Sequence, residues 1–205
     1  MLVKFDHITY VVNKSNLASA KQLLAKCGYV ERFSEENVDN PICKSAYISH
    51  LNTKHSLYFF YSPSGIPVEI VSYVYTTQNQ QPLDYKLGST NVLCKTGVLQ
   101  ESIDFYCVLG ACANANGSLE MKGLLDKKAI GISFKEKHDF ATNLDNEGWC
   151  CPALIVDSYK KTKMQLENSG YFCTEADVMV VNGRNLFVCF AIGQNNEIVE
   201  IISSK

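Results

Sequence analysis

The sequence lacks a strong excess of charge, a long apolar run and the common nucleotide-binding and hydrolase motifs. Its 205 residues carry a formal net charge of −2, with an isoelectric point near 6.1, so we expect no basic surface for nucleic acid or an anionic membrane. No apolar run is long enough to span a bilayer, and the first residues do not have the pattern of a secretory signal. The patterns G-x-G-x-x-G, G-x-x-x-x-G-K-[S/T], H-E-x-x-H and G-x-S-x-G are all absent. We therefore expect a cytoplasmic protein without nucleic-acid or membrane partners.

The nine cysteines do not form a disulfide or zinc pattern. Their number is odd, no pair has zinc-finger spacing, and Cys150 and Cys151 are adjacent, which prevents chelation of the C-x-x-C kind. Most lie in apolar stretches that predict a strand or a helix: Cys43, Cys94, Cys107, Cys173 and Cys189. We expect reduced thiols that pack as small hydrophobic side chains.

The chain repeats one order of elements, which is a strand, a helix and then several strands. With 46% hydrophobic and 20% charged residues, it has the composition of a folded protein with a core. In the first segment, KFDHITYVV predicts a strand, and NLASAKQLLAKCGY predicts an amphipathic helix that ends at Gly28. The stretches that follow are rich in β-branched and aromatic residues and predict strands: YVERF, KSAYISHL, HSLYFFY and IPVEIVSY.

The same order recurs twice, so the sequence predicts three units. The units and linkers are a first unit at 1–75, a linker at 76–88, a second, shortened unit at 89–136, a linker at 137–149 and a third unit at 150–205. The end of the first unit, LYFFYSPSGIPVEIVS (57–72), aligns without a gap on VCFAIGQNNEIVEIIS (188–203), at a constant offset of 131 residues. This alignment places Glu69 on Glu200.

A β-α-β-β-β unit that opens with DHITYVV and closes with SPSGIPVEIV, together with the phrase ESIDFY followed by LG in the second unit, is similar to a known pattern. It resembles the vicinal oxygen chelate superfamily, which contains glyoxalases, bleomycin-resistance proteins and extradiol dioxygenases. The resemblance implies an α+β fold in which repeated units form a cup-shaped mixed sheet with flanking helices. It also implies that the first strand of a unit directs a histidine into the cup and the last strand directs a glutamate.

Three of the implied ligand positions hold a ligating residue in this chain: His7, Glu69 and Glu200. In the second unit, the histidine position falls on Asn91 and the glutamate position near Gly131. In the third unit, the histidine position falls near Pro152. The resemblance therefore implies a divalent metal ion held by His7, Glu69 and Glu200, with the two glutamates as catalytic residues.

Two arrangements of the units stay open. Pairing the first unit with the third would bring all three predicted ligands into one cup, whereas pairing the first with the second would leave only His7 and Glu69 there. The ligand chemistry favours the first arrangement. Chain order favours the second, because neighbouring units usually pack together.

The periodicity of the strands agrees with a site. Alternate residues of a strand share a face, so His7, Thr9 and Val11 are expected on one side of the first strand. Glu69 and Glu200 each have apolar neighbours on their own face, and a charge in that setting must be paired, coordinated or near water. Alternatively, His7 is a rim histidine bonded to backbone, and the glutamates point outward or pair with Lys or Arg.

One imidazole and two carboxylates suit zinc, manganese, nickel or iron(II) and leave coordination positions for a substrate. With only one histidine in position, the two-histidine site of extradiol iron enzymes is not present. The leading hypothesis is a metal-dependent lyase or isomerase acting on a small organic molecule. The alternatives are a metal-free protein of the bleomycin-resistance type, which binds a drug or metabolite, and an interaction protein that has lost the site. For assembly we consider a homodimer.

Other histidines and the aromatic residues carry less information about function. His50 and His55 flank the stretch LNTK and are predicted to be solvent-exposed loop residues, and His138 falls in the second linker. The aromatic residues between 58 and 75 predict mainly sheet core, with a minority lining an apolar pocket for a flat ligand.

Overall fold

The computed structural model describes residues 3–75, 90–114, 118–124, 129–136 and 143–204. The predicted linker at 76–88 and His138 lie outside these described residues. In chain order, the first unit consists of β1 (Val3–Asn13), a short 3-10 helix η1 (Lys14–Asn16), α1 (Leu17–Lys26), β2 (Val30–Val38), a 3-10 helix η2 (Ile42–Tyr47), β3 (His55–Tyr61) and β4 (Val68–Tyr73).

The two later segments repeat this order. One contains β5 (Asn91–Thr96), α2 (Leu99–Val108), β6 (Cys112–Ala113), β7 (Leu119–Lys122) and β8 (Ala129–Glu136). The other contains β9 (Gly148–Val156), α3 (Tyr159–Asn168), β10 (Phe172–Cys173), β11 (Asp177–Val181), β12 (Arg184–Ile192) and β13 (Ile198–Ser203). Each time, the first strand lies parallel to the last: β1 with β4, β5 with β8, and β9 with β13. The expected α+β fold with a mixed sheet is confirmed.

In the described residues, each of the three α-helices ends at a glycine in the left-handed backbone conformation. The φ angle is 81° at Gly28, 91° at Gly110 and 82° at Gly170. A side chain with a Cβ is strained at such angles, so glycine ends a helix at low cost. The helix end predicted at Gly28 is confirmed. Within the described ranges, no helix is long and apolar enough to cross a membrane.

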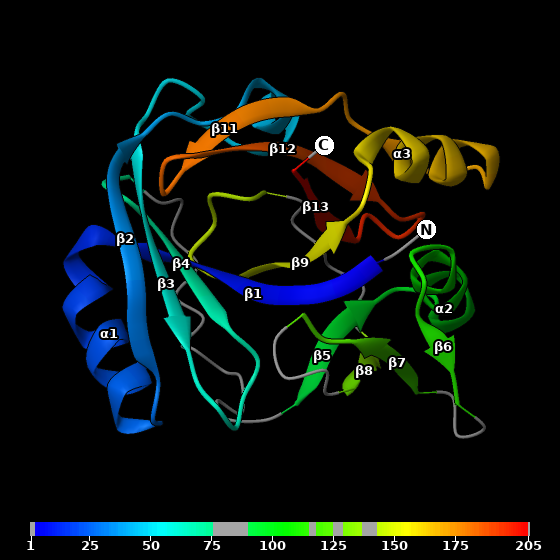
Figure 1. Ribbon diagram of the computed structural model, residues 1–205, viewed down its shortest axis with the longest axis horizontal. Helices are drawn as coiled ribbons and strands as arrows, with labels where there is room; N and C mark the ends of the chain where they lie inside the picture. The colour runs from blue at the N-terminus through cyan, green and yellow to red at the C-terminus, as the bar shows by residue number, and fades with distance from the viewer. Residues whose placement is uncertain (1–2, 76–89, 115–117, 125–128, 137–142, 205) are drawn as a thin grey trace.

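The first and third units share one sheet. Strand β1 pairs antiparallel with β9, which gives the order β10-β12-β13-β9-β1-β4-β3-β2, with β11 beside β12. The second unit forms a separate four-stranded sheet in the order β5-β8-β7-β6. Figure 1 shows the large sheet curving from β2 at the left to β12 along the top, with the small sheet and α2 at the lower right. Of the two arrangements left open by the sequence, the one that joins units one and three is observed.

One face of the large sheet packs into the main core. Alternate residues of its central strands point to this face and are buried: Ile8, Tyr10, Val12, Val68, Ile70, Val199 and Ile201. Each helix adds an apolar side chain to the same core: Leu24, Phe105 and Leu166. Because strand side chains alternate, His7 on β1, Glu69 on β4 and Glu200 on β13 point to the opposite face. That opposite face holds the candidate site.

The segment KSAYISHL (44–51), predicted as a strand, is not one. It begins within η2, which leaves the sheet and crosses toward the third unit. The Ile42 N–H donates a 2.6 Å hydrogen bond to the Asp177 carboxylate, and the Cys43 thiol donates one of 3.4 Å to the Val188 carbonyl. These long-range contacts hold the segment away from the sheet, and the local pattern of β-branched and aromatic residues does not reveal them.

All nine cysteines are free thiols. Four of them are buried: Cys94, Cys151, Cys173 and Cys189. The prediction that Cys107 packs in the interior is wrong, because it occupies an exposed position of α2.

Candidate metal centre

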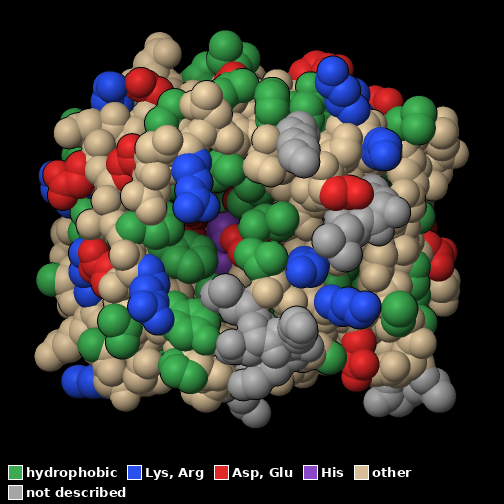
Figure 2. Space-filling view, in the orientation of Figure 1, with side chains coloured by type: hydrophobic (Ala, Val, Ile, Leu, Met, Phe, Trp, Pro, Cys, Tyr) green, Lys and Arg blue, Asp and Glu red, His purple; other side chains and the backbone are tan. Residues whose placement is uncertain are grey.

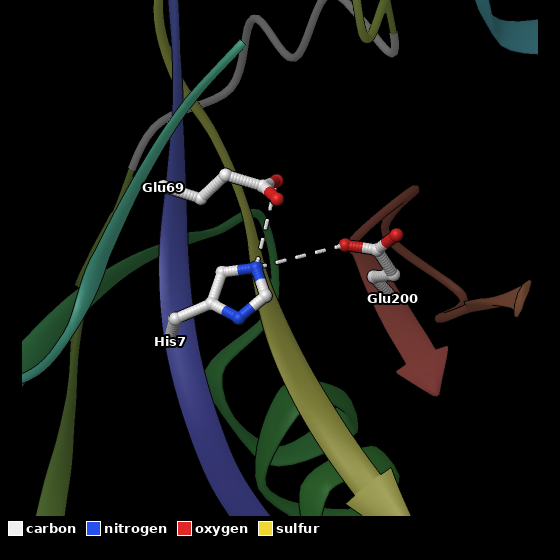
Figure 3. Close-up of side chains that lie close together, drawn as sticks. All are labelled: His7, Glu69 and Glu200. Atoms are coloured by element: carbon white, nitrogen blue, oxygen red, sulfur yellow. Dashed lines mark ion pairs between the residues drawn. The ribbon is translucent and has the colours of Figure 1, made fainter. Parts of the chain in front are cut away.

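His7, Glu69 and Glu200 point toward one another from three different strands. They lie on β1, β4 and β13, respectively (Figure 3). The Nε2 atom of His7 is 3.6 Å from a carboxylate oxygen of Glu69 and 3.9 Å from one of Glu200. One ligand atom from each residue lies within 4.8 Å of the other two. The structure therefore brings together the three residues selected from the sequence.

Strand register explains this meeting. Glu69 on β4 pairs with Thr9 on β1. Ala153 on β9 pairs with His7 on one side and with Glu200 on the other. Paired residues of neighbouring strands project to the same face, so His7 and Glu200 flank Ala153 in one row. The small side chain of Ala153, which is fully buried, leaves space between the imidazole and the carboxylate.

Asp6 orients the imidazole of His7. The Nδ1 atom of His7 is 2.7 Å from a carboxylate oxygen of Asp6. Neighbouring residues of a regular strand point to opposite faces, but the register against β9 shifts between Phe5 and His7. This bulge lets the Asp6 carboxylate reach the ring. A proton on Nδ1, donated to Asp6, leaves Nε2 facing the glutamates. Strand alternation did not identify Asp6, and its position next to a histidine was the only signal in the sequence.

The three groups interact strongly through their charges. Burial lowers the pKa of His7, but the charge of Glu69 and the hydrogen bond to Asp6 raise that pKa well above its usual value. Burial raises the pKa of Glu69, but the charge of His7 has the opposite effect, and the net shift of this pKa is downward. Burial, and then the charge of Glu69, raise the pKa of Glu200 to about 7. Two carboxylates this close therefore compete for one positive charge.

The donor set fits a divalent metal ion. The Nε2 atom of His7 is buried and has no hydrogen-bond partner among the described residues, because both glutamates are too distant. Two atoms bound to one ion at about 2.0–2.2 Å can be at most about 4.4 Å apart. The separations of 3.6 and 3.9 Å lie within that limit. The Thr9 hydroxyl donates a 3.4 Å hydrogen bond to Glu69 and supports one of the carboxylates.

None of the described residues of the second unit belongs to this cluster. In the first unit, His7 lies two residues before the strand partner of Glu69. In the second unit, Asn91 on β5 lies in the same way two residues before the strand partner of Ser133 on β8. The Asn91 and Ser133 side chains are hydrogen-bonded at 3.1 Å. The glutamate position of this unit is therefore Ser133 rather than Gly131, and a neutral pair replaces the ligands there.

In the third unit, Cys151 occupies the histidine position. Cys151 lies two residues before Ala153, which is the strand partner of Glu200. His7 has the same relation to Glu69, because it lies two residues before the strand partner of Glu69. The alignment by sequence had placed this position near Pro152. A contact with the neighbouring Cys150 thiol and burial raise the pKa of Cys151 well above its usual value. A protonated thiol is a poor metal ligand, so the histidine position is lost in this unit.

The cluster is reachable from solvent at the bottom of a hollow. Figure 2 shows a histidine and acidic side chains at the centre of this face, with hydrophobic side chains around them. The side chains of Glu69 and Glu200 are 14% and 13% exposed, while that of His7 is 4% exposed. The carboxylates therefore line the floor of the hollow, and the imidazole lies behind them.

Two further polar residues are buried on this side of the sheet. The expectation that His55 is a solvent-exposed loop residue is wrong, because it begins β3, pairs with Tyr73 and is only 2% exposed. Lys44 on η2 is 8% exposed; burial lowers its pKa, but neighbouring groups, Glu200 among them, raise that pKa above its usual value. Sequence patterns did not identify Lys44, and its only signal was a single lysine within an otherwise uncharged stretch.

Several solved structures are similar to this chain. Glyoxalase I from Zea mays shares 15% identity, with a TM-score of 0.38 over 98% of this chain and 68% of its own. A protein from Bacillus subtilis assigned as a dioxygenase shares 12% identity, with a TM-score of 0.39 over 98% of this chain and 62% of its own. Methylmalonyl-CoA epimerase from Mycobacterium tuberculosis shares 9% identity, with a TM-score of 0.47 over 98% of this chain and 87% of its own.

No protein-family model matches the chain, and no curated protein matches it. The chain spans about two thirds of the length of glyoxalase I from Zea mays.

Proposed function

We propose that the chain is a metal-dependent enzyme of lyase or isomerase type that moves a proton on a small organic molecule. His7, Glu69 and Glu200 would hold a divalent ion at the bottom of the hollow. One observation carries the proposal: a buried imidazole nitrogen without a partner among the described residues faces two carboxylates, all within 4.8 Å. Zinc, manganese, nickel and iron(II) are all compatible with these ligands.

Each residue of the site has a separate task in this proposal. When bound, the ion would act as a Lewis acid that stabilises negative charge on a substrate oxygen. Asp6 holds the His7 ring so that Nε2 faces the ion site. Thr9 restrains Glu69 through its hydroxyl. Among the described residues, none makes a hydrogen bond to the Glu200 carboxylate, so its second oxygen would accept a proton from the substrate and return it.

A metal-free protein that binds a drug or metabolite is the second candidate, and one observation favours it. The Lys44 ammonium acts on both Glu69 and Glu200, so it could balance part of their charge without a metal. A protonated His7 would balance the rest. In that protein the hollow would hold a ligand between aromatic walls and would carry out no proton transfer.

Metal analysis separates the two candidates. We would purify the protein without chelators and measure bound metals by mass spectrometry, beside His7→Ala and a matched His50→Ala control, since His50 is exposed. An enzyme of the proposed kind retains about one divalent ion per chain in the wild type and in His50→Ala, and loses it in His7→Ala. Equal metal content in all three proteins, or none in the wild type after reconstitution with each of the four metals, would rule the proposed metal centre out.

A further inference from the structure

A second polar cluster lies on the same face of the sheet as the candidate metal centre. Its members are Lys44 from η2, His55 from β3 and Tyr73 from β4. All three are buried: Lys44 is 8% exposed, and His55 and Tyr73 are 2% exposed. The proposed proton transfer uses none of these residues, so their burial calls for a separate explanation.

Lys44 is a buried cation without an ion pair among the described residues. It extends from η2 so that its ammonium lies 6.0 Å from the ring centre of Phe190, the strand partner of Glu200. It also lies close to the Tyr73 hydroxyl, which donates its own proton to Asn40 at 2.8 Å. The oxygen of Tyr73 is thus turned toward Lys44 as an acceptor. An ammonium group has three donors, so this arrangement leaves Lys44 with donors for a ligand.

His55 adds a neutral donor beside this cation. Neither ring nitrogen of His55 has a hydrogen-bond partner among the described residues, although both are buried. Its ring centre is 5.3 Å from that of Tyr73. Burial, and then the charge of Lys44, lower the pKa of His55 to about 3, so its ring is uncharged near neutral pH. A neutral imidazole offers one N–H donor and one acceptor.

An apolar band lies between the His55–Tyr73 pair and Glu69 along β3 and β4. On this face of the paired strands β3 and β4, His55 pairs with Tyr73. The next pair on the same face is Leu57 with Val71, and the pair after that contains Glu69. Leu57 and Val71 are buried in a small cluster with Val11. Glu69 and Tyr73 are four residues apart on one face, which is about 13 Å along a strand. The face is therefore polar at both ends and apolar between them.

We propose that Lys44 and His55 bind a carboxylate group of the small molecule that occupies the hollow, with Tyr73 holding the Lys44 side chain in place. This inference deepens the proposed function, because it assigns the substrate to the class of small carboxylic acids. Its apolar part would lie along the band, and its reactive end would face Glu200.

The chemistry of the cluster selects a carboxylate among anions. A divalent ion would match the charge of Glu69 and Glu200, which leaves the Lys44 ammonium to a ligand. A single lysine beside a neutral histidine suits a group with one negative charge. Phosphate groups are usually bound by several donors, commonly an arginine fork or a helix N-terminus, and neither is found among the described members of this cluster. Leaving the Lys44 charge buried without a partner is costly, so a neutral ligand is disfavoured.

The test uses three probes that share a phenyl ring: benzoate, its neutral isostere benzamide, and phenyl phosphate. Their affinities are measured by calorimetry on metal-loaded wild type, Lys44→Met and Lys54→Met. Lys54 is the matched control, because it is a half-exposed lysine that pairs with Asp39 at the surface. Since a hydrogen bond to a charged group contributes about 1.5–3 kcal/mol, benzoate should bind the wild type about 10- to 150-fold more tightly than benzamide. Lys44→Met should abolish this preference, and Lys54→Met should keep it.

Two additional measurements keep the inference falsifiable. If Lys44→Met does not fold, Lys44→Arg should retain the preference for benzoate, and benzoate should shift the ring nitrogen resonances of His55 in the wild type. Equal binding of benzoate and benzamide by the wild type, or tighter binding of phenyl phosphate than of benzoate, would overturn the assignment. Metal content is measured on the same samples. If the wild type binds no metal but prefers benzoate, the carboxylate site is supported and the metal centre is refuted. If the wild type binds metal but does not prefer benzoate, the metal centre is supported and the carboxylate site is refuted.

Discussion

The buried imidazole of His55 should make the stability of the protein depend on pH in a calculable way. Burial and the charge of Lys44 lower the pKa of His55 to about 3 in the folded state. In the unfolded chain a histidine has a pKa of about 6.5. Below pH 6.5, His55 therefore binds a proton in the unfolded chain but stays neutral in the folded protein. This uptake favours the unfolded state, so the stability associated with His55 is complete above pH 6.5 and is lost as the pH falls toward 3.

The size of the effect follows from the two pKa values. At pH 5 the unfolded state gains about 2 kcal/mol from protonation of this one residue. His55→Phe removes the titrating group and replaces the ring with one of similar size. The free energy of unfolding, measured by urea denaturation with a chelator present, should fall between pH 7 and pH 5 by about 2 kcal/mol more in the wild type than in the variant.

The comparison is made within each protein, so a packing change caused by the substitution cancels. His50→Phe provides the control, because His50 is exposed and its replacement should leave the pH dependence of the wild type in place. If His55→Phe and the wild type lost the same free energy between pH 7 and pH 5, the buried, neutral state of His55 would be refuted. The donor role assigned to this ring would then have to be abandoned as well.

Three other substitutions test the site and the core. Asp6→Asn should weaken metal binding by about 10- to 100-fold, because it removes the carboxylate that orients His7, and competition with a coloured chelator measures it; unchanged affinity would contradict this role. Ala153→Leu should cost about 1–3 kcal/mol of stability and abolish metal binding, because the larger side chain enters the space between His7 and Glu200. Metal analysis and urea denaturation check this, and a variant with full metal content would show that the row of His7, Ala153 and Glu200 does not form the floor of the site. Leu24→Ala in the main core should cost about 2–5 kcal/mol and leave metal content unchanged, since Leu24 is fully buried on the other face of the sheet; a stability within experimental error of the wild type would argue against that core.

Local sequence pattern determined the elements and the faces of the central strands. The period of two along DHITYVV placed His7 and Thr9 on one side of β1 and Ile8 on the other, and the structure keeps that division. The repeat of 57–72 at 188–203 matched Glu69 with Glu200, and both emerge on the same face of one sheet. These features could be predicted because strand alternation and helix ends depend on residues that are close together in the chain.

The tertiary structure alone decided which strands became neighbours. The pairing of β1 with β9 brings Glu200 to His7, the bulge in that pairing turns Asp6 toward the ring, and the crossing of η2 buries Lys44. Each depends on contacts between residues that are far apart in sequence, or on a register shift that alternation does not encode. The sequence by itself therefore determined which side chains share a face, whereas only the packing of distant strands determined which of them meet.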